Sequence, residues 1–582
     1  MRLPEINGLS RSVDTNIEFR GINHNLFVGE NEFFDTYNLC STNYPVMTPR
    51  AARAYCGMLA NAQGLYARGK IVWAADGKLY YGGEQVQGVT LTSGEKQFVG
   101  MGAYVIVFPD GVRYNTSTGA VDWLAASWTG ASATVTLSRQ DGEDYENVTT
   151  SDTEPANPQG GDYWLDTSVE PHVLRVYSAT GSWNAILTTY ARIEAAGLNE
   201  AFKVGDAVTF AGGPDEINGT HEIVALGHNE TSGTGWAVIS CVLDQVTQTA
   251  TGLSASRDVP QMDYVTELNN RLWGCSNQNH EIYCCRLGDP TNWKAYGTGA
   301  GDAWAATIGS SGDFTGACAF GGAVLFWKED ILHKVMGTKP GNFQIIDTPV
   351  RGVQKGSEKS LCIVNEVLMY KSRDGVMIYD GASPMNVGEK LGTARLYDAC
   401  AGVEGDRYYI SMRTEGGTWG LWVFNEAKGL WHREDETHAL AFAALDGQLY
   451  FLRADGHMMA VRGNAEKMKT ASEADAASVA VELPFDWWAE TGDMLLELPD
   501  NKYISRIQIK ASVDKESALM IEAMYDSDGQ WRTLWKRGRS RKASFTVPLM
   551  PARCDHMRLR VSGHGHAAVY AISKEIERGS EL

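Results

Sequence analysis

Short apolar stretches separated by turn-forming dipeptides run along most of the chain. Two of them, WAADGKLYYGG (73–83) and FAALDGQLYFL (442–452), place Asp-Gly between an apolar run and an apolar-aromatic run. Glycine tolerates the positive φ that a two-residue turn requires, so each stretch predicts a β-hairpin. Their similarity, at opposite ends of the chain, indicates a repeated hairpin unit.

The order apolar strand, turn, apolar-aromatic strand, second turn occurs seven times. Each second turn follows the first by 7 to 11 residues, which is room for one strand. From the third unit onward, first turns are 40 to 52 residues apart. The predicted first turns are Asp76-Gly77, Gly102-Ala103, Asn269-Asn270, Gly321-Gly322, Asn365-Glu366, Gly405-Asp406 and Asp446-Gly447; Asp110-Gly111 and Asp374-Gly375 are among the second turns.

A period of this size, with several short strands in each unit, is typical of β-propeller blades. The sequence therefore predicts an all-β chain built on a propeller of seven blades, or six if the first two units are irregular. The turns at Asp76-Gly77 and Asp446-Gly447 are predicted to lie in neighbouring blades, where the ring closes. Unrelated hairpins in ordinary sandwiches are the alternative.

Residues 125–258 interrupt the repeat and are predicted to be an insertion of small β modules. Proline and glycine bracket one module at 150–186, and Gly-Asp and Asn-Gly turns mark a second, barrel-like one at 202–229. In the first module Trp164, Tyr177 and Trp183 could form a face on which a sugar stacks. The core of a small sheet is the more common place for such aromatics.

The two ends of the chain differ from the repeat. The first 60 residues have little periodicity and predict an extended segment that docks on the ring or on a neighbouring subunit. The last hundred alternate with period two, which predicts an antiparallel sandwich. The predicted parts are an N-terminal segment (1–60), first blades (61–124), the insertion (125–258), remaining blades (259–462), a linker (463–480) and a C-terminal sandwich (481–582).

Composition supports this picture of a chain of 582 residues. It is 43% hydrophobic and contains 62 glycines and 17 tryptophans, which favours strands joined by tight turns. The N-terminus lacks the apolar core of a secretory signal, and no run of 18 apolar residues predicts a membrane span. The ten cysteines are scattered without a C-x-x-C pair, so reduced, buried thiols are expected.

The formal net charge is −20, from 71 acidic and 51 basic residues. This balance argues against a protein that coats nucleic acid, because phosphate neutralisation needs Lys and Arg. It is compatible with a surface past which DNA slides without binding, and equally with a merely solvated exterior.

Candidate chemistry is sparse. The sequence has no P-loop, H-E-x-x-H, G-x-S-x-G or zinc pattern, so no catalytic residue, metal or cofactor is predicted. His564 and His566 are expected to be exposed turn residues. A pair of glycosidase carboxylates could still lie among the 71 acids.

Three consecutive stretches carry a family resemblance. They are NNRLWGCSNQNHEIYCCRLGDPTNW (269–293), GDFTGACAFGGAVLFWKEDILHKVMG (312–337) and GVQKGSEKSLCIVNEVLMYKSRDGVMIYDG (352–381). Together they resemble the propeller of bacteriophage tail nozzle proteins, the tail-tubular-B-like and stabilisation-protein-like components of short-tailed phages. The resemblance covers about 110 residues well, and the chain departs from the family in its insertion and its N-terminal segment.

The resemblance implies a ring, usually six-fold, at the end of a virion tail, assembled in the bacterial cytoplasm. Its partners would be further copies of the chain, a tail adaptor, and DNA that passes without specific binding. The expected function is therefore a structural, non-enzymatic tail nozzle or hub. The alternative is a tail appendage that binds or cleaves host-surface glycans.

Overall fold

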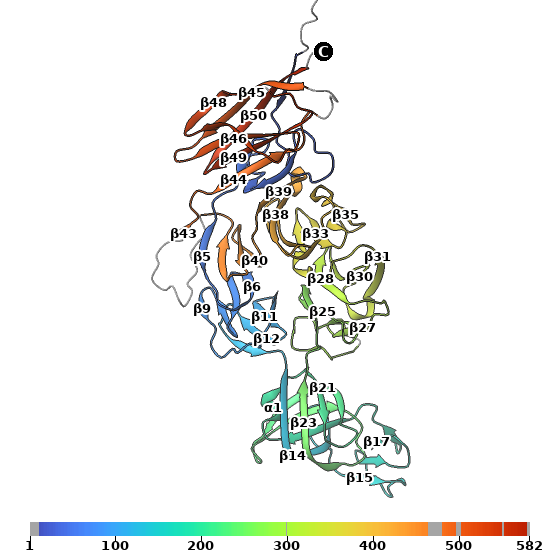
Figure 1. Ribbon diagram of the computed structural model, residues 1–582. Helices are drawn as coiled ribbons and strands as arrows, with labels where there is room; N and C mark the ends of the chain where they lie inside the picture. Colours follow the sequence, from blue (N-terminus) through green and yellow to red (C-terminus); the bar gives the residue numbers. More distant parts are fainter. Residues whose placement is uncertain (1–10, 298, 464–479, 496–501, 550–551, 579–582) are drawn as a thin grey trace, which may run out of the picture. The chain divides into compact units, whose positions relative to one another are not determined.

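The computed structural model describes residues 11–297, 299–463, 480–495, 502–549 and 552–578 (Figure 1). Regular structure in these ranges is almost entirely β-strand, apart from α1 (Leu198–Ala201) and short 3-10 turns. The chain packs as two compact units. The first holds the described residues up to Lys96, Trp327–Leu332 and those from Thr348 onward; the second holds Gln97–Phe326 and His333–Asp347. Positions 464–479 of the predicted linker lie outside the described ranges.

Four-stranded antiparallel meanders recur in the first unit, each pairing strands that follow one another along the chain. One consists of β6 (Ala62–Arg68), β7 (Lys70–Ala75), β8 (Lys78–Tyr81) and β9 (Glu84–Gln85). A second consists of β32 (Cys362–Val364), β33 (Val367–Ser372), β34 (Gly375–Tyr379) and β35 (Met385–Asn386). A third consists of β36 (Leu396–Glu404), β37 (Arg407–Thr414), β38 (Trp419–Asn425) and β39 (Leu430–Asp435).

One meander of the first unit takes its fourth strand from the N-terminal segment. β40 (Ala439–Leu445), β41 (Gln448–Arg453) and β42 (His457–Ala460) are followed in the sheet by β5 (Ala54–Met58), and β43 (Ala480–Val481) pairs with the far side of β5. The main-chain pairing of β42 with β5 runs from His457↔Met58 to Ala460↔Ala54. A strand from the start of the chain thus completes the last blade.

The second unit repeats the same meander. One sheet consists of β10 (Gln97–Met101), β11 (Tyr104–Phe108), β12 (Val112–Asn115) and β13 (Val121–Trp123). Another consists of β24 (Tyr264–Leu268), β25 (Arg271–Ser276), β26 (Glu281–Cys284) and β27 (Trp304–Thr307). A further sheet of the same kind consists of β28 (Phe314–Phe320), β29 (Ala323–Lys328), β30 (Ile331–Met336) and β31 (Gln344–Pro349). Seven such meanders in the described residues confirm the predicted all-β propeller class.

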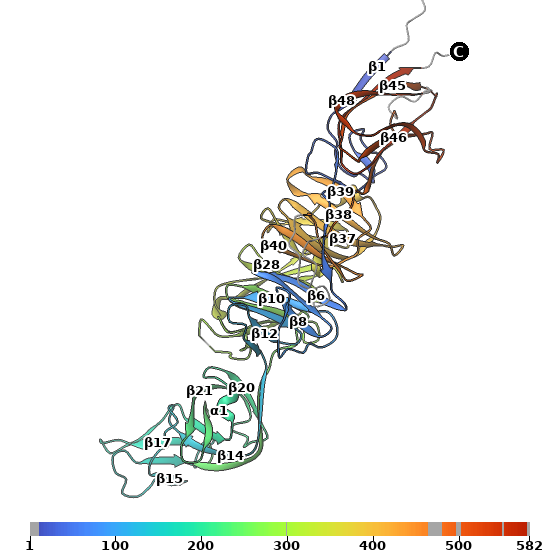
Figure 2. The ribbon, with the colours of Figure 1, turned by 90° about the vertical axis from the view of Figure 1, so that its left-hand side faces the viewer.

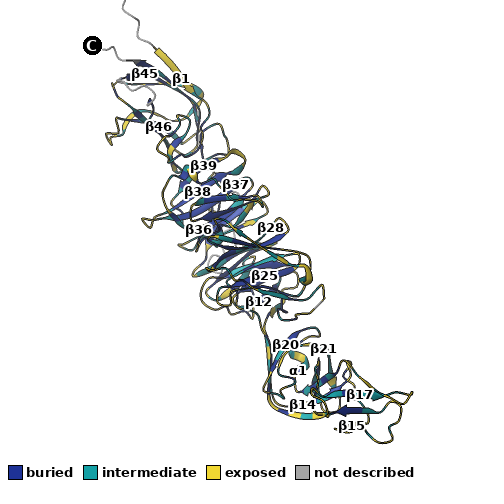
Figure 3. Ribbon diagram, turned by 90° about the vertical axis from the view of Figure 1, so that its right-hand side faces the viewer, coloured by how far each residue is buried: buried dark blue, intermediate teal, exposed yellow. Residues whose placement is uncertain are grey.

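First strands of successive sheets lie side by side. In the first unit β36 contacts β32 and β40, and β40 contacts β6; in the second, β24 contacts β10 and β28. The strands β36 to β38 are mostly buried (Figure 3), because both faces of an interior blade are covered by neighbours. Trp73, Ala443 and Tyr450 share one core cluster between β7, β40 and β41. The two similar hairpins therefore do lie in neighbouring sheets, as predicted.

The equivalence of those two turns was wrong in detail. Asp446-Gly447 joins the first and second strands of its sheet, whereas Asp76-Gly77 joins the second and third strands of its own. In the sheet of β6, the first turn is at Gly69 instead. Both Asp-Gly pairs have positive φ at each residue, 50° and 70° at 76–77 and 50° and 74° at 446–447. The same two-residue turn closes either kind of hairpin, so its sequence does not reveal which strands it joins.

The insertion in the second unit is a closed barrel with a small sheet added to it. The barrel order is β14 (Ala126–Ser138), β19 (Tyr190–Ala195), β22 (Thr234–Ser240), β21 (Gly219–Asn229), β20 (Ala207–Ala211) and β23 (Thr247–Arg257). The added sheet is β15 (Val148–Ser151), β16 (Tyr163–Asp166), β17 (Val173–Tyr177) and β18 (Trp183–Ala185). Ala126 pairs with Arg257, so the insertion leaves and re-enters at one place.

The C-terminal region is a two-sheet sandwich, as predicted, but the N-terminal segment supplies a strand to each sheet (Figures 1 and 2). One sheet is β1 (Arg11–Asn16), β50 (Ala567–Arg578), β45 (Lys502–Val513) and β48 (Ser540–Val547). The other is β2 (Phe33–Tyr37), β44 (Asp486–Thr491), β49 (Met557–His564), β46 (Ala518–Tyr525) and β47 (Arg532–Arg537). The short β3 (Leu39–Cys40) and β4 (Thr48–Pro49) pair with each other.

Candidate functional site

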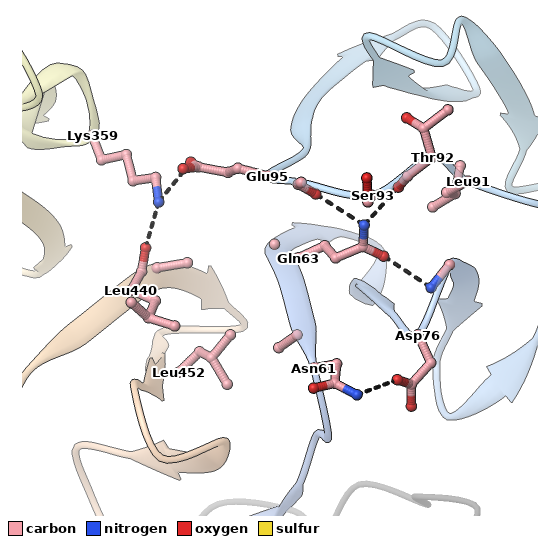
Figure 4. Close-up of a pocket in the computed structure, with 15 residues that line it drawn as sticks. Asn61, Gln63, Asp76, Leu91, Thr92, Ser93, Glu95, Lys359, Leu440 and Leu452 are labelled. Atoms are coloured by element: carbon pink, nitrogen blue, oxygen red, sulfur yellow. Dashed lines mark hydrogen bonds and ion pairs between the residues drawn. The ribbon is translucent and has the colours of Figure 1, made fainter.

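A pocket of about 600 Å³ in the first unit lies beside the first strands β6 and β40 (Figure 4). Its walls also include the turn between β7 and β8, the loop after β9, and Lys359 of a 3-10 turn. Pockets of this volume with a few convergent polar groups are the usual form of small-ligand sites. The lining residues are Asn61, Ala62, Gln63, Gly64, Asp76, Gly77, Leu91, Thr92, Ser93, Gly94, Glu95, Lys359, Leu440, Ala441 and Leu452.

Lys359 bridges two segments of the pocket wall. Its Nζ lies 2.6 Å from Oε1 of Glu95 and donates a 2.8 Å hydrogen bond to the carbonyl of Leu440 in β40. Burial alone would lower the pKa of Lys359, but the neighbouring Cys400 thiol and Glu95 carboxylate together raise it. The amine therefore stays protonated, and it serves as a charged cross-link rather than as a nucleophile or base.

The other polar groups of the pocket hold its loops in place. The Gln63 amide donates to the carbonyls of Thr92 (2.7 Å) and Gly94 (2.9 Å), and its Oε1 accepts from the Gly77 amide (3.0 Å). Asn61 donates to Asp76 over 2.6 Å. In Figure 4 the Gln63 side chain points at the loop backbones, and the Asn61 side chain points at the Asp76 carboxylate. The hydrogen bonds of Gln63 and Asn61 therefore stabilise the loops around the pocket.

Titratable groups around the pocket are tuned by burial. Burial raises the pKa of Glu358, and the nearby Glu95 adds to the shift. Burial also raises the pKa of the Cys400 thiol to about 12, so this cysteine is not a reactive thiolate. His438 stacks on Trp419 with ring centroids 3.5 Å apart, and burial lowers its pKa. Sequence reasoning missed this cluster because its residues come from four separate stretches without a shared motif.

The structure brings Trp164, Tyr177 and Trp183 together on one face of the small sheet. Trp183 lies edge-on to Tyr177 (5.0 Å between centroids) and to Trp164 (5.5 Å). The opposite face carries Leu174, which joins the barrel core, so the aromatic face is directed away from the barrel. Trp164 is 7% exposed, while the other two are half-buried.

A charged pair completes this aromatic face. Arg175 lies over the ring of Trp164, 5.6 Å from its centroid, and donates a 2.9 Å hydrogen bond to Asp166. Hydrogen bonds from Ser168, together with this arginine, lower the pKa of Asp166 despite its burial. Aromatic rings beside an Arg–carboxylate pair are groups that can contact the apolar and hydroxyl faces of a sugar. The sequence prediction of a glycan contact remains a prediction.

The remaining turn residues lie between strands. Asp110-Gly111 joins β11 to β12 with a φ of 67° at Gly111, and Asp374 precedes Gly375 where β33 turns into β34. Asp374 belongs to an ion-pair group with Arg351 (2.8 Å), and Arg351 and Arg373 both contact Asp330. These exposed charges hold a turn against a neighbouring loop.

The residues that carry the family resemblance also make structural contacts. Arg271 is buried and donates to the carbonyls of Cys285, Ala300 and Asp302 at 2.7 to 2.8 Å. Asn292 donates to the Gly205 carbonyl, and Arg286 donates to the same carbonyl and pairs with Glu222 at 3.0 Å. The L-G-D-P-x-N-W run therefore fastens a blade to the inserted barrel.

Residues 352–360, which belong to the third resembling stretch, are also held by hydrogen bonds. The backbone N–H of Gln354 donates to the Lys371 carbonyl, and the Lys371 ammonium donates to Oε1 of the Gln354 side chain over 2.9 Å. Burial lowers the pKa of Lys371 to about 8. A Cβ at Gly352 would lie 2.0 Å from the Lys328 carbonyl, so no larger residue fits there. These contacts position Lys359 for its ion pair with Glu95.

The remaining candidate chemical groups are the two C-terminal histidines, the cysteines and metal-ligating side chains. His564 is the last residue of β49 and His566 lies in the turn that follows; both are exposed, and each contacts a carboxylate, Asp486 at 2.8 Å and Asp514 at 3.0 Å. The ten cysteines have free thiols. Over the described ranges, no three His, Cys, Asp or Glu side chains are grouped to hold a metal ion. No helix in that part of the chain is long and apolar enough to cross a membrane.

Comparison with known proteins gives structural matches only. No protein-family model matches the chain, and no curated protein matches it significantly in sequence. Among solved structures, BamB from Moraxella catarrhalis is 12% identical, with 71% of this chain and 97% of that one covered at a TM-score of 0.30. An exo-β-1,3-galactanase from Phanerochaete chrysosporium is 8% identical, with 53% and 94% covered at a TM-score of 0.21. Raptor from Chaetomium thermophilum is 10% identical, with 72% and 29% covered at a TM-score of 0.29.

Proposed function

We propose that this chain is a structural subunit of a bacteriophage tail, and that copies of it form a six-fold nozzle or hub ring through which the genome leaves. The observation that supports this most directly is how the resembling residues are used. Arg271, Asn292 and Lys371 are committed to backbone carbonyls and loop contacts, and Lys359 cross-links two parts of a blade-lined pocket. Such residues preserve a rigid scaffold.

In this proposal the DNA passage is formed between copies of the chain. The pocket beside β6 and β40 has the volume of a small-ligand site, about 600 Å³, and the Lys359–Glu95 ion pair lies in its wall. It is far too small for a duplex. A ring of subunits provides a wide passage without opening any blade.

The acidic balance suits this role. Six copies at −20 each carry a net charge of −120, and acidic groups that face a passage repel phosphate. DNA would then move through the ring without pausing at specific contacts.

The test is electron microscopy and mass measurement of the virion that contains this chain. The proposal expects about six or twelve copies in a ring on the tail axis. Purified chain, alone or with its adaptor, should give the same ring and should not hydrolyse glycans. A single copy at a fibre tip would contradict the proposal.

A second candidate function is a glycan-binding appendage, and it rests on the aromatic face of the small sheet. Trp164, Tyr177 and Trp183 gather there beside Arg175 and Asp166, on the side away from the barrel. Saccharide binding by the purified chain, measured by calorimetry on host polysaccharide and lost in Trp183→Ala, would support this function. Trp123→Ala, which changes an exposed tryptophan outside the sheet, is the matched control.

A further inference from the structure

The turn that connects β47 to β48, which belong to different sheets of the sandwich, concentrates positive charge on a strongly acidic chain. Lys536, Arg537, Arg539, Arg541 and Lys542 are all exposed and take five of the seven positions from 536 to 542, which we call the basic turn (536–542). None of the five forms an ion pair with another described residue. Arg537 lies over Phe545, 5.0 Å from its centroid, and Lys542 lies over Tyr570 at 3.7 Å. Like charges this close repel each other unless a partner covers them.

The inserted module has a matching excess of negative charge. Between residues 140 and 174 the sequence contains nine acids and no Lys or Arg. Five of these acids are exposed and have no ion pair within the described ranges: Asp141, Glu143, Glu146, Asp152 and Glu154. We call this stretch the acidic segment (141–154). Of the two neighbouring arginines, Arg192 is already paired with Asp144 at 3.0 Å, and Arg139 lies over the ring of Tyr145 with its charge near Asp141.

We infer that the basic turn of one copy docks on the acidic segment of a second copy of this chain. Five unpaired cations meet five unpaired carboxylates, so each surface supplies what the other lacks. The contact is heterologous, because the two surfaces belong to different parts of the chain, and repetition of a heterologous contact generates a closed ring or an open filament. The inference deepens the proposed ring and rests on it for the number of copies.

Two features favour a second copy over nucleic acid as the occupant. A chain with a net charge of −20 repels DNA at long range, whereas the carboxylates of a second copy attract the basic turn. The aromatic rings near the basic turn are also already engaged: Trp535 lies against Phe545 at 5.3 Å, and Arg560 covers Trp531 at 4.0 Å. They offer no open ring on which a base could stack.

The experiment is a charge swap on the full chain, read by sedimentation velocity over a range of protein concentrations at about 0.05 M and about 0.5 M salt. We expect wild-type self-association to weaken at high salt. The variant R537E/R539E/R541E should associate at least about ten-fold more weakly at low salt. D141K/E143K/E146K should do the same, and the combination of both sets should restore association. K78E/K339E/R395E, which reverses three exposed cations elsewhere, should behave as wild type.

Each outcome decides the inference. The pairing is overturned if the combined variant does not recover association while circular dichroism shows that the variants with a single set of substitutions remain folded. It is also overturned if the response to salt does not depend on protein concentration. Binding of a short duplex DNA by the wild type, lost in R537E/R539E/R541E, would assign the basic turn to nucleic acid instead. A six-fold ring that survives both charge reversals would refute this contact while leaving the proposed ring intact.

Discussion

Lys359 and Glu95, which are 264 positions apart in the sequence, form a 2.6 Å ion pair in the wall of the pocket beside β40. The same ammonium donates to the Leu440 carbonyl, so one side chain joins three distant segments of the first unit. Its side chain is 33% exposed and that of Glu95 is 54% exposed, which places the pair at the edge of the interior. The pair ties a loop before β10 to the first strand of another blade.

Replacement of Lys359 by Met should reduce the free energy of unfolding by about 1–2 kcal/mol. The loss is smaller than for a fully buried pair because water still screens Glu95, and larger than for a surface pair because the Leu440 carbonyl loses its donor. Urea unfolding of the full chain measures it. Lys78→Met, at an exposed position of β8, is the matched control and should change little. Equal stability of the two variants would contradict the cross-link.

Gly447 should be intolerant of any side chain. Its φ is 74° and no atom would lie within 4 Å of an added Cβ, so backbone strain is the whole cost. Gly447→Val should destabilise the chain by about 1–3 kcal/mol and Gly447→Ala by about 1 kcal/mol. Gly309 has equal space and no left-handed φ, so Gly309→Val is the control. A neutral Gly447→Val variant would mean that the turn differs from the one described.

The insertion should be removable as a unit. β14 and β23 pair Ala126 with Arg257, so a short linker can join residues 125 and 258. The barrel core is its own cluster, which should allow the blades to keep their β signal and cooperative melting after deletion of 126–257. Circular dichroism and calorimetry test this. The linker variant should lose some stability, because Arg286 and Asn292 lose their contacts with Gly205. Complete unfolding would show that the barrel is part of the propeller core.

Acid should destabilise the chain in two separate pH windows. Burial, assisted by Lys428, lowers the pKa of His432 from 6.5 to about 4. The unfolded chain takes up a proton at this histidine below pH 6.5, whereas the folded chain does not do so until about pH 4. The folded state therefore loses about 3 kcal/mol of stability as pH falls from 6.5 to 4. His432→Gln should flatten stability in that window, whereas the exposed His566→Gln should not.

The lower window belongs to Asp435. Although burial opposes it, the Arg53 guanidinium at 2.6 Å lowers the pKa of Asp435 from 3.8 to about 2. This carboxylate contributes stability above pH 3.8 that is lost as pH falls through 2. Unfolding free energies measured from pH 8 to 2 should therefore fall in two steps. A pH-independent stability between 6.5 and 4 in the wild type would contradict the buried, neutral His432.

Turn chemistry and alternation were enough to predict the propeller class, the inserted region and the sandwich. Asp446-Gly447 and Asp110-Gly111 mark strand ends because left-handed backbone favours these residues, and that preference is local. The position of Asp76-Gly77 within its sheet was misread for the same reason, since a local signal does not number the strands. Nor did the sequence reveal that β1, β2 and β5 join sheets formed by the far end of the chain.

The pocket could not be predicted because long-range contacts create it. Glu95, Lys359 and Leu440 have no common motif, and only the packing of β40 against β6 makes them neighbours. The aromatic face was partly predictable, since Tyr177 and Trp183 are opposite each other in a short hairpin. That Trp164 joins them depends on the pairing of β16 with β17.

The most direct test of the central claim is imaging of the assembled particle that contains this chain, with the density fitted by the seven-bladed fold. The account predicts about six or twelve copies arranged in a ring on the tail axis, with DNA retained behind an intact ring. A single copy at the tip of a fibre, with release of reducing ends from host polysaccharide by the purified chain, would contradict the structural role and favour the glycan-directed appendage.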